Sequence, residues 1–231
     1  MKFFNYLLNQ LSNSSNHKLE IHNHGHRCYS EGLTSHERKL VTLLAKNLDP
    51  KKYFIFNNIT LPSSNTITTQ IDHVVVSEQG IFVIESKDFK GWIYADKHQK
   101  NWTRVYYRGL KNQFQNPIYQ NFAHVSALKE QLPFLSKCFF SVVVFSRNSE
   151  FKTERIEKVL YDDELVDFIK SKDKKWLREE EVMMTIGKLS VLCQTNTTTA
   201  EEHVQNLNSI HINSDFEAFA IRLGSTDSNS R

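Results

Sequence analysis

The chain of 231 residues lacks any long apolar run. Its uninterrupted apolar segments, such as residues 138–140 and 142–145, are far shorter than the about 20 residues that a membrane-spanning helix needs. Residues 1–11 are partly apolar, but Asn5 and Asn9 interrupt them where a signal peptide would have a continuous apolar region. We therefore expect a soluble, cytoplasmic protein that does not contact a membrane.

Cysteine, proline and glycine are also scarce, with three, four and seven residues respectively. Cys28, Cys138 and Cys193 follow no repeated spacing, so the sequence predicts no framework of disulfide bonds and favours a reducing compartment. The net charge of +3 is too small to indicate a class of partner. The length suits one main domain with an apolar core, or such a core with a small helical addition.

Residues 70–87 carry the strongest strand signals in the chain. Two runs of β-branched and aromatic residues, 71–76 and 81–84, flank the polar turn 77–80, which ends in glycine. Two short apolar runs separated by such a turn pair as an antiparallel hairpin. We therefore predict a hairpin over this segment.

The register of this hairpin brings charged side chains together at its open end. If Val76 pairs with Ile81, counting outward places Asp72 directly opposite Glu85. Strand side chains alternate, so Lys87 lies on the same face as Glu85. A register shifted by one residue would turn Asp72 to the other face. Three charges in an otherwise apolar hairpin are costly unless they have a function.

Two interpretations of this charged cluster are compatible with the spacing. Two carboxylates a few ångströms apart repel each other unless a divalent cation lies between them, and Mg²⁺ prefers one or two carboxylates together with waters and a substrate phosphate. A lysine beside such an ion can orient or deprotonate a water for attack on phosphorus, which is the chemistry of a phosphodiesterase. The other interpretation is a salt-bridged hairpin end at the surface. Spacing alone leaves both open.

Basic and aromatic residues are interleaved from residue 87 to residue 111, a composition typical of nucleic-acid-binding surfaces. We expect a second hairpin here, in which residues 92–95 pair with residues 102–106. Its tryptophans, Trp92 and Trp102, are predicted to pack in the core, with stacking on bases as the alternative, while its basic side chains are candidates for contacts with phosphates. The basic residues assigned to nucleic-acid binding are Lys90, Lys97, Lys100, Arg104, Arg108 and Lys111.

The segment Thr34-Ser35-His36-Glu37 has the pattern of a capping box that opens a helix running to about residue 48. Glu37 lies on the apolar side of this helix, so it can satisfy the start of its own helix or reach the charged cluster of the hairpin. The apolar stripe of the helix is formed by Leu40, Val41, Leu44 and Leu48.

Asn116 followed by Pro117 predicts the start of another helix, which Pro133 ends. Gln120 and His124 lie one turn apart on it. A solvated helix face is the default interpretation of this pair, and binding of a phosphate or an ordered water is the alternative. The predicted apolar side of the helix consists of Ile118, Phe122, Val125 and Leu128.

The remaining patterns complete an α/β arrangement. Residues 53–59 predict a strand, and the apolar run 139–145 predicts a strand covered on both faces. Helices are predicted over residues 162–170, 177–192 and 199–207. We expect a mixed central sheet flanked by helices, with an α-helical C-terminal portion. The predicted divisions are an N-terminal arm (1–31), a core domain (32–150), the helical portion (151–223) and a disordered tail (224–231).

The N-terminal arm contains an alternating series of metal-ligating residue types. In an extended segment, His22, His24, His26 and Cys28 would all face one side, as zinc ligands can. Adjacent positions on one side of a strand rarely wrap a tetrahedral ion, so we prefer a polar lead-in segment and keep zinc binding as the alternative.

Four motifs in one order resemble a known family. Asp72 with Glu85-Ser86-Lys87 resembles the D…(E/D)xK signature of the PD-(D/E)xK nuclease superfamily. Together the motifs resemble the NERD, or nuclease-related, domain over about residues 32–132, although His36-Glu37 stands where the family has Gly-Glu. The motifs are Ile71-Asp72-His73, Gly80-Ile81-Phe82-Val83-Ile84-Glu85-Ser86-Lys87, Lys90-Gly91-Trp92-Ile93 and Asn116-Pro117-Ile118-Tyr119-Gln120.

The resemblance implies a restriction-endonuclease-like fold and a deoxyribonuclease that depends on Mg²⁺ or Mn²⁺, acting in DNA processing or in defence against foreign DNA. It implies that Asp72 and Glu85 are metal ligands, that Glu37 is a third acid, that Lys87 positions the attacking water and that Gln120 supports the site. DNA is the expected partner, with a homodimer or other DNA-processing proteins as further candidates. The rival function is a nucleic-acid-binding or recruitment module whose acidic cluster does not cut.

Overall fold

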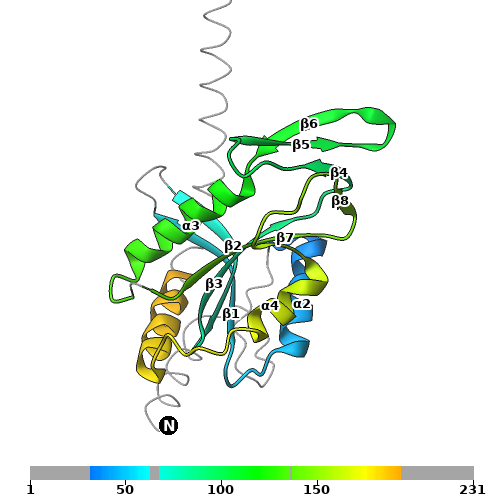
Figure 1. Cartoon of the computed structure of the whole chain (residues 1–231). Helices are drawn as coiled ribbons and strands as arrows, with labels where there is room; N and C mark the ends of the chain where they lie inside the picture. The colour runs from blue at the N-terminus through cyan, green and yellow to red at the C-terminus, as the bar shows by residue number, and fades with distance from the viewer. Residues whose placement is uncertain (1–31, 63–67, 136, 194–231) are drawn as a thin grey trace, which may run out of the picture.

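A computed structural model describes residues 32–62, 68–135 and 137–193, which form two β-sheets with helices packed around the larger one (Figure 1). The predictions for residues 1–31, for the helix 199–207 and for the tail 224–231 concern residues outside the described ranges. The elements are α2 (Ser35–Asn47), β1 (Phe54–Pro62), β2 (Thr68–Ser77), β3 (Gly80–Lys87), β4 (Gly91–Tyr94), β5 (Asn101–Val105), η1 (Tyr107–Gly109), β6 (Lys111–Gln115), α3 (Pro117–Gln131), β7 (Phe139–Phe145), β8 (Ser149–Phe151), β9 (Val159–Tyr161), η2 (Asp162–Glu164), α4 (Leu165–Lys170) and a further helical segment at residues 179–193.

The central sheet has five strands in the order β1-β2-β3-β7-β9. β1, β2 and β3 are antiparallel, whereas β7 runs parallel to β3 and β9 parallel to β7. Val76 pairs with Ile81, so the predicted register of the first hairpin is confirmed. The turn requires Gly80, which has φ +138°, and whose Cβ, if present, would lie 2.6 Å from the carbonyl oxygen of Cys138.

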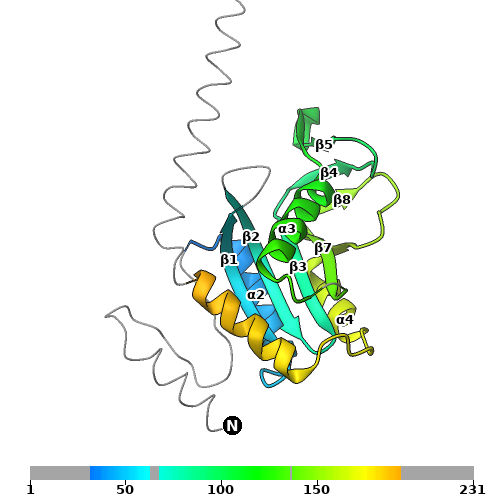
Figure 2. The ribbon, with the colours of Figure 1, turned by 90° about the vertical axis from the view of Figure 1, so that its left-hand side faces the viewer.

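Helices cover both faces of the central sheet, as Figure 2 shows. α3 and residues 179–193 pack on one face, and α2 and α4 pack on the other. The alternation of side chains along β2 and β3 therefore supplies two separate apolar cores. The first core includes Val74, Val83, Leu128 and Leu189, and the second includes Leu40, Leu44, Phe82, Val142 and Leu165.

The second sheet has four strands in the order β6-β5-β4-β8. The pairing of β4 with β5 confirms the predicted second hairpin. Trp102 is buried, with 1% of its surface exposed, and its ring stacks on Phe145 from the central sheet. This aromatic core joins the two sheets.

Two predictions about apolar side chains are wrong. Phe122 does not belong to the buried side of α3, because 70% of its surface is exposed, whereas Val125 and Leu128 are buried as predicted. Trp92 does not pack in the core, because 47% of its surface is exposed. Trp92 points outward because its neighbour Ile93 faces the core, and Phe122 points outward because its neighbour Asn121 is buried against the sheet.

The predicted boundary at residue 150 stays a prediction. β9 lies beyond it and pairs with β7 of the central sheet. Residues 179–193 contribute Val182, Ile186 and Leu189 to the core that they share with β1 and β2. Within the described ranges, no helix is both long enough and apolar enough to cross a membrane.

Candidate functional site

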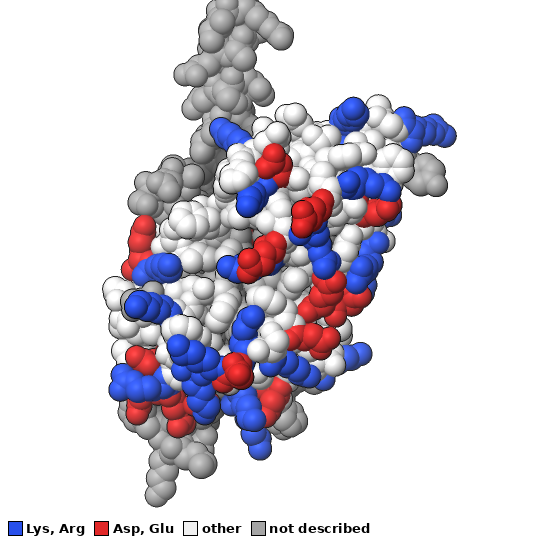
Figure 3. Space-filling view, in the orientation of Figure 1, with Lys and Arg blue, Asp and Glu red and all other residues white. Residues whose placement is uncertain are grey.

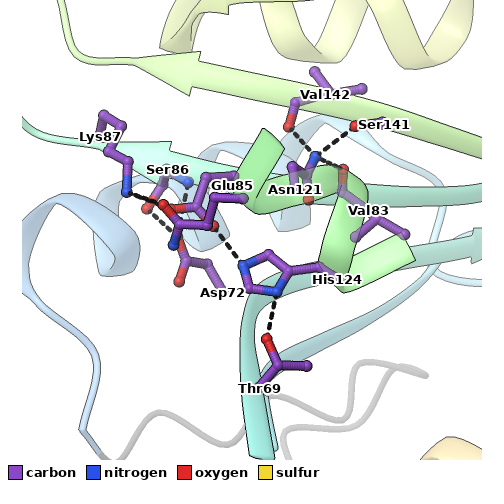
Figure 4. Close-up of polar contacts among 11 residues, drawn as sticks. Thr69, Asp72, Val83, Glu85, Ser86, Lys87, Asn121, His124, Ser141 and Val142 are labelled. Atoms are coloured by element: carbon purple, nitrogen blue, oxygen red, sulfur yellow. Dashed lines mark hydrogen bonds and ion pairs between the residues drawn. The ribbon is translucent and has the colours of Figure 1, made fainter. Parts of the chain in front are cut away.

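The charged residues of the first hairpin meet where β2 and β3 separate, beneath the first turns of α3 (Figure 4). The paired residues of these strands end at His73 and Ile84, one step before Asp72 and Glu85. Asp72 then accepts two hydrogen bonds on Oδ2 from Ser86, one from the backbone nitrogen at 2.7 Å and one from Oγ at 3.0 Å. These bonds hold the Asp72 carboxylate beside the end of β3.

Glu85 is the most deeply buried acid of the site, with 1% of its surface exposed. Lys87 Nζ donates to Glu85 Oε1 and, at 3.1 Å, to Gln120 Oε1 on α3. The structure thus brings together four of the five predicted site residues. Lys87 joins Glu85 to Gln120, and Asp72 binds Ser86, which lies between Glu85 and Lys87 in β3.

His124 also belongs to this cluster, and the interpretation of a solvated helix face is wrong for it. His124 is 4% exposed, its Nε2 lies 3.0 Å from Glu85 Oε2, and its Nδ1 lies 2.8 Å from Thr69 Oγ1. With a carboxylate as the acceptor, Nε2 carries the proton and Nδ1 accepts from the Thr69 hydroxyl. Because Gln120 and His124 are four residues apart, their side chains lie on the same face of the helix, and both contact β3.

Burial and mutual repulsion separate the pKa values of the two acids. Burial, and then the charge of Glu85, raise the pKa of Asp72 to about 7. Burial also acts to raise the pKa of Glu85, but the hydrogen bond from His124 and the charge of Lys87 outweigh it and hold the pKa below its ordinary value. At neutral pH the pair therefore holds one ionised carboxylate and one that is partly protonated.

Glu37 caps its own helix. Its side chain accepts from the backbone nitrogen of Thr34 at 2.7 Å, and the backbone nitrogen of Glu37 donates to Thr34 Oγ1, so the predicted capping box is confirmed. The charge of Glu37 contributes to the raised pKa of Asp72, after burial and the charge of Glu85. Its role as a metal ligand stays a prediction.

The six basic residues assigned to nucleic-acid binding lie on and around the second sheet, and all except the half-buried Arg104 are exposed. Arg104 is held in place, because its Nε donates to the Lys90 carbonyl at 2.9 Å and its guanidinium lies over the rings of Phe89 and Tyr106. Figure 3 shows basic side chains at the end of the β5–β6 hairpin, and mixed charges over most of the visible face. Contact of these residues with nucleic acid stays a prediction.

The fold and this site define the class of the domain. Residues 34–146 match the family described as the nuclease-related domain, NERD, so this stretch is a nuclease-related domain, with the restriction-endonuclease-like fold. An uncharacterised protein of Bacillus anthracis is 42% identical over 106 residues, which cover 44% of this chain and 50% of that relative. The matched region thus spans half of the relative's length. No solved structure matches the chain.

Proposed function

We propose that this domain is a metal-dependent phosphodiesterase that cuts DNA, in DNA processing or in defence against foreign DNA. The observation that carries the proposal is the pair of acids formed by the half-buried Asp72 and the buried Glu85, beside Lys87 of the same strand as Glu85. Burying two acids together is costly, and a bound cation offsets that cost.

The donor set suits a hard divalent cation. Asp72 uses Oδ2 for Ser86, while its Oδ1 makes no hydrogen bond to the described residues. No three His, Cys, Asp or Glu side chains gather as a metal site anywhere in the described ranges, but Mg²⁺ takes as few as one or two carboxylates and completes its shell with waters and phosphate oxygens. Asp72 and Glu85 would hold Mg²⁺ or Mn²⁺, with Glu37 as an outer acid. Such an ion supplies Lewis acidity and lowers the pKa of a coordinated water.

Lys87 and Gln120 have the positions needed to handle the attacking water. Glu85 and Gln120 both accept a hydrogen bond from Lys87 Nζ, and these two bonds hold the ammonium group beside the two acids. An ammonium held there can orient a water and stabilise the negative charge that develops on the phosphate oxygens. Gln120 is a positioning residue, because it acts through Lys87.

The choice of DNA as the substrate rests on the basic residues near the site. Lys90 follows Lys87 by three residues, and Lys97, Lys100, Arg108 and Lys111 are exposed on the loops and strands that come next. Cations in such positions neutralise phosphates along a nucleic-acid backbone. A homodimer or other DNA-processing proteins are the further partners that we propose.

Cleavage of supercoiled, linear duplex and single-stranded DNA, with Mg²⁺, Mn²⁺ or EDTA, tests this proposal. Lys87→Ala should lose roughly 10²-fold or more in cleavage rate while its affinity for DNA stays within a few-fold. Lys175→Ala is the matched control. Lys175 also pairs with an acid at 2.6 Å, but that acid, Glu78, lies in the turn between β2 and β3, at the opposite end of the hairpin from the site. Equal background cleavage by the wild type and Lys87→Ala on every substrate would replace the nuclease with a module that binds without cutting.

A further inference from the structure

Two aromatic side chains stand on the outer face of the second sheet. Trp92 and Tyr94 are 47% and 42% exposed, whereas Ile93 and Ala95, which alternate with them, face the aromatic core. Nothing in the fold requires rings at these two positions, because the inward-facing residues already fill the core between the sheets. Large rings on the exposed face of a sheet point to a binding surface.

Polar and basic side chains surround the two rings. The strand register places Lys111 of β6, Val105 of β5 and Trp92 in one row, and it places Gln113, Thr103 and Tyr94 in the next. Lys152, which follows β8, has its Nζ 4.9 Å from the centre of the Trp92 ring. Glu150 lies beside Trp92 but is paired with Lys152. The face therefore offers two rings, hydrogen-bonding side chains and the exposed Lys111, while Glu150 and Lys152 neutralise each other.

We propose that Trp92 and Tyr94 form a stacking platform for the bases of a single-stranded nucleic acid, an inference that rests on the proposed function and specifies its substrate. Every base has a flat face that stacks on an aromatic ring, and lysines at the edge attract the phosphates. A duplex cannot use such a platform, because its base faces are covered by neighbouring base pairs. Residues two apart on a strand have their Cα atoms about 7 Å apart, roughly twice the 3.4 Å step of stacked bases, so the spacing allows each ring to take one base of an extended strand.

The platform is close enough to the acidic pair for one strand to reach both. Trp92 follows Lys87 by five residues, so their Cα atoms lie within about 18 Å of each other even if the segment is fully extended. β3 pairs with β7 and β4 pairs with β8, so the same two segments of chain lead from the site to the platform. A few nucleotides span such a distance.

Binding measured in EDTA, where metal-dependent cleavage is stopped, tests the platform independently of catalysis. The probes are a fluorescein-labelled oligo(dT) and a fully paired linear duplex with the same number of phosphates. Trp92→Leu and Tyr94→Leu should each weaken binding of oligo(dT) by about 5- to 100-fold, while Trp92→Phe retains most of it. The slope of log affinity against log salt should not change, because no charge is removed.

Trp176→Leu is the matched control. Trp176 is 41% exposed and has Lys174 Nζ 3.7 Å from its ring centre, but its backbone contacts Glu78 at the other end of the first hairpin. It should bind both probes as the wild type does. Trp176→Leu leaves two of the three tryptophans, the exposed Trp92 and the buried Trp102. Bound oligo(dT) should therefore protect the fluorescence of Trp92 from quenching by acrylamide. This measurement leaves the platform intact.

The outcomes separate the platform from the nuclease. The platform is overturned, even if the protein cuts DNA, if Trp92→Leu binds oligo(dT) as the wild type does. It is also overturned if this variant loses affinity equally for both probes, or if oligo(dT) does not protect the fluorescence of Trp92. A selective loss for oligo(dT) in a protein that cuts nothing would keep the platform and remove the nuclease. If Trp92→Leu binds oligo(dT) as the wild type does but its sedimentation coefficient shows a changed oligomeric state, this face is a protein–protein contact and the inference is overturned.

Discussion

Asp72 and His73 are neighbours in β2 with shifted pKa values, raised for Asp72 and lowered for His73. The two shifts have opposite effects on how the stability of the protein depends on pH. Burial, and then the charge of Glu85, raise the pKa of Asp72 from 3.8 to about 7, so between these values the folded state binds the extra proton and stability falls as pH rises. Burial, and then the charge of His36, lower the pKa of His73 from 6.5 to about 4, so between these values the unfolded state binds the extra proton and stability rises with pH. The two slopes cancel from about pH 4 to pH 6.5.

Asp72→Asn should remove one slope and expose the other. Without metal, we expect the variant to gain up to about 4 kcal/mol at pH 8, because a neutral amide replaces a buried carboxylate that was repelled by Glu85. Its stability should increase from pH 4 to pH 6.5, the remaining effect of His73, whereas the wild type stays nearly level there. Urea denaturation at a series of pH values measures both.

Metal should reduce the advantage of Asp72→Asn in stability. Excess Mg²⁺ or Mn²⁺ should raise the melting temperature of the wild type by ligand linkage and leave Asp72→Asn unchanged. Calorimetry that finds equal metal binding by the two proteins would contradict the assignment of Asp72 as a ligand.

His124→Ala should destabilise the protein and raise the pKa of Glu85. The change removes the hydrogen bonds to Glu85 and Thr69 and leaves a buried carboxylate with one partner fewer, which costs about 1–3 kcal/mol. The bond from His124 is the leading cause that lowers the Glu85 pKa, so the acidic limb of the cleavage profile should move to higher pH. His98→Ala, at an exposed turn position, is the control and should change neither property. An unchanged acidic limb would show that His124 does not act on Glu85.

At the scale of elements, the sequence predicted the parts whose pattern is local. The first hairpin has its register, the capping box of α2 is present, and β7 spans the same residues as the predicted strand, because turn chemistry, capping and apolar runs act within a few residues. The buried face of α3 was not predictable in this way. Asn121 is fully buried, and its Nδ2 donates to Val83, Ser141 and Val142 from two strands, which sets the rotation of the helix.

The site shows the same division. Asp72, Glu85 and Lys87 follow from one hairpin, so spacing within the chain brings them together. The place of His124 beside Glu85 depends on how α3 docks on the sheet, which no local pattern specifies. A polar residue at a buried helical position is hidden from a hydrophobic pattern, because such patterns assign burial only to apolar side chains.

Gly91→Ala tests how strictly the start of β4 depends on glycine. Gly91 has φ +107°, and a Cβ there would lie 2.3 Å from the carbonyl oxygen of Val105 in the neighbouring strand. We expect a loss of about 3 kcal/mol or more in the free energy of unfolding, from backbone strain together with the clash. Gly109→Ala is the control, because Gly109 has φ +78° but nothing within 4 Å of the added methyl, and it should cost about 1 kcal/mol. Equal losses would mean that β5 can move away from the methyl group.

For the whole molecule, the contacts of β7 test the predicted boundary at residue 150. β9 pairs with β7 from Val143 to Phe145, and residues 179–193 cover part of the first core. A chain ending at residue 150 should therefore aggregate or lose cooperative melting, because it exposes a long apolar strand edge. A chain ending at residue 193 is the comparison. If both melt cooperatively at the same temperature, residues 151–193 are separate from the core.

Two segments of chain cross side by side from the central sheet to the second sheet, and hydrogen bonds tie them together. Ser146 N donates to the Lys87 carbonyl at 3.0 Å, and Gly91 N donates to the Asn148 carbonyl at 3.1 Å. A single connecting strand can swivel, but a bonded ribbon of two resists both bending and twisting. The ribbon thus keeps Trp92 at a fixed distance from Lys87. If the proposed platform holds the end of a strand that the proposed nuclease cuts, the cut would fall a fixed number of nucleotides from that end, which a sequencing gel would show as a narrow band of fragment sizes.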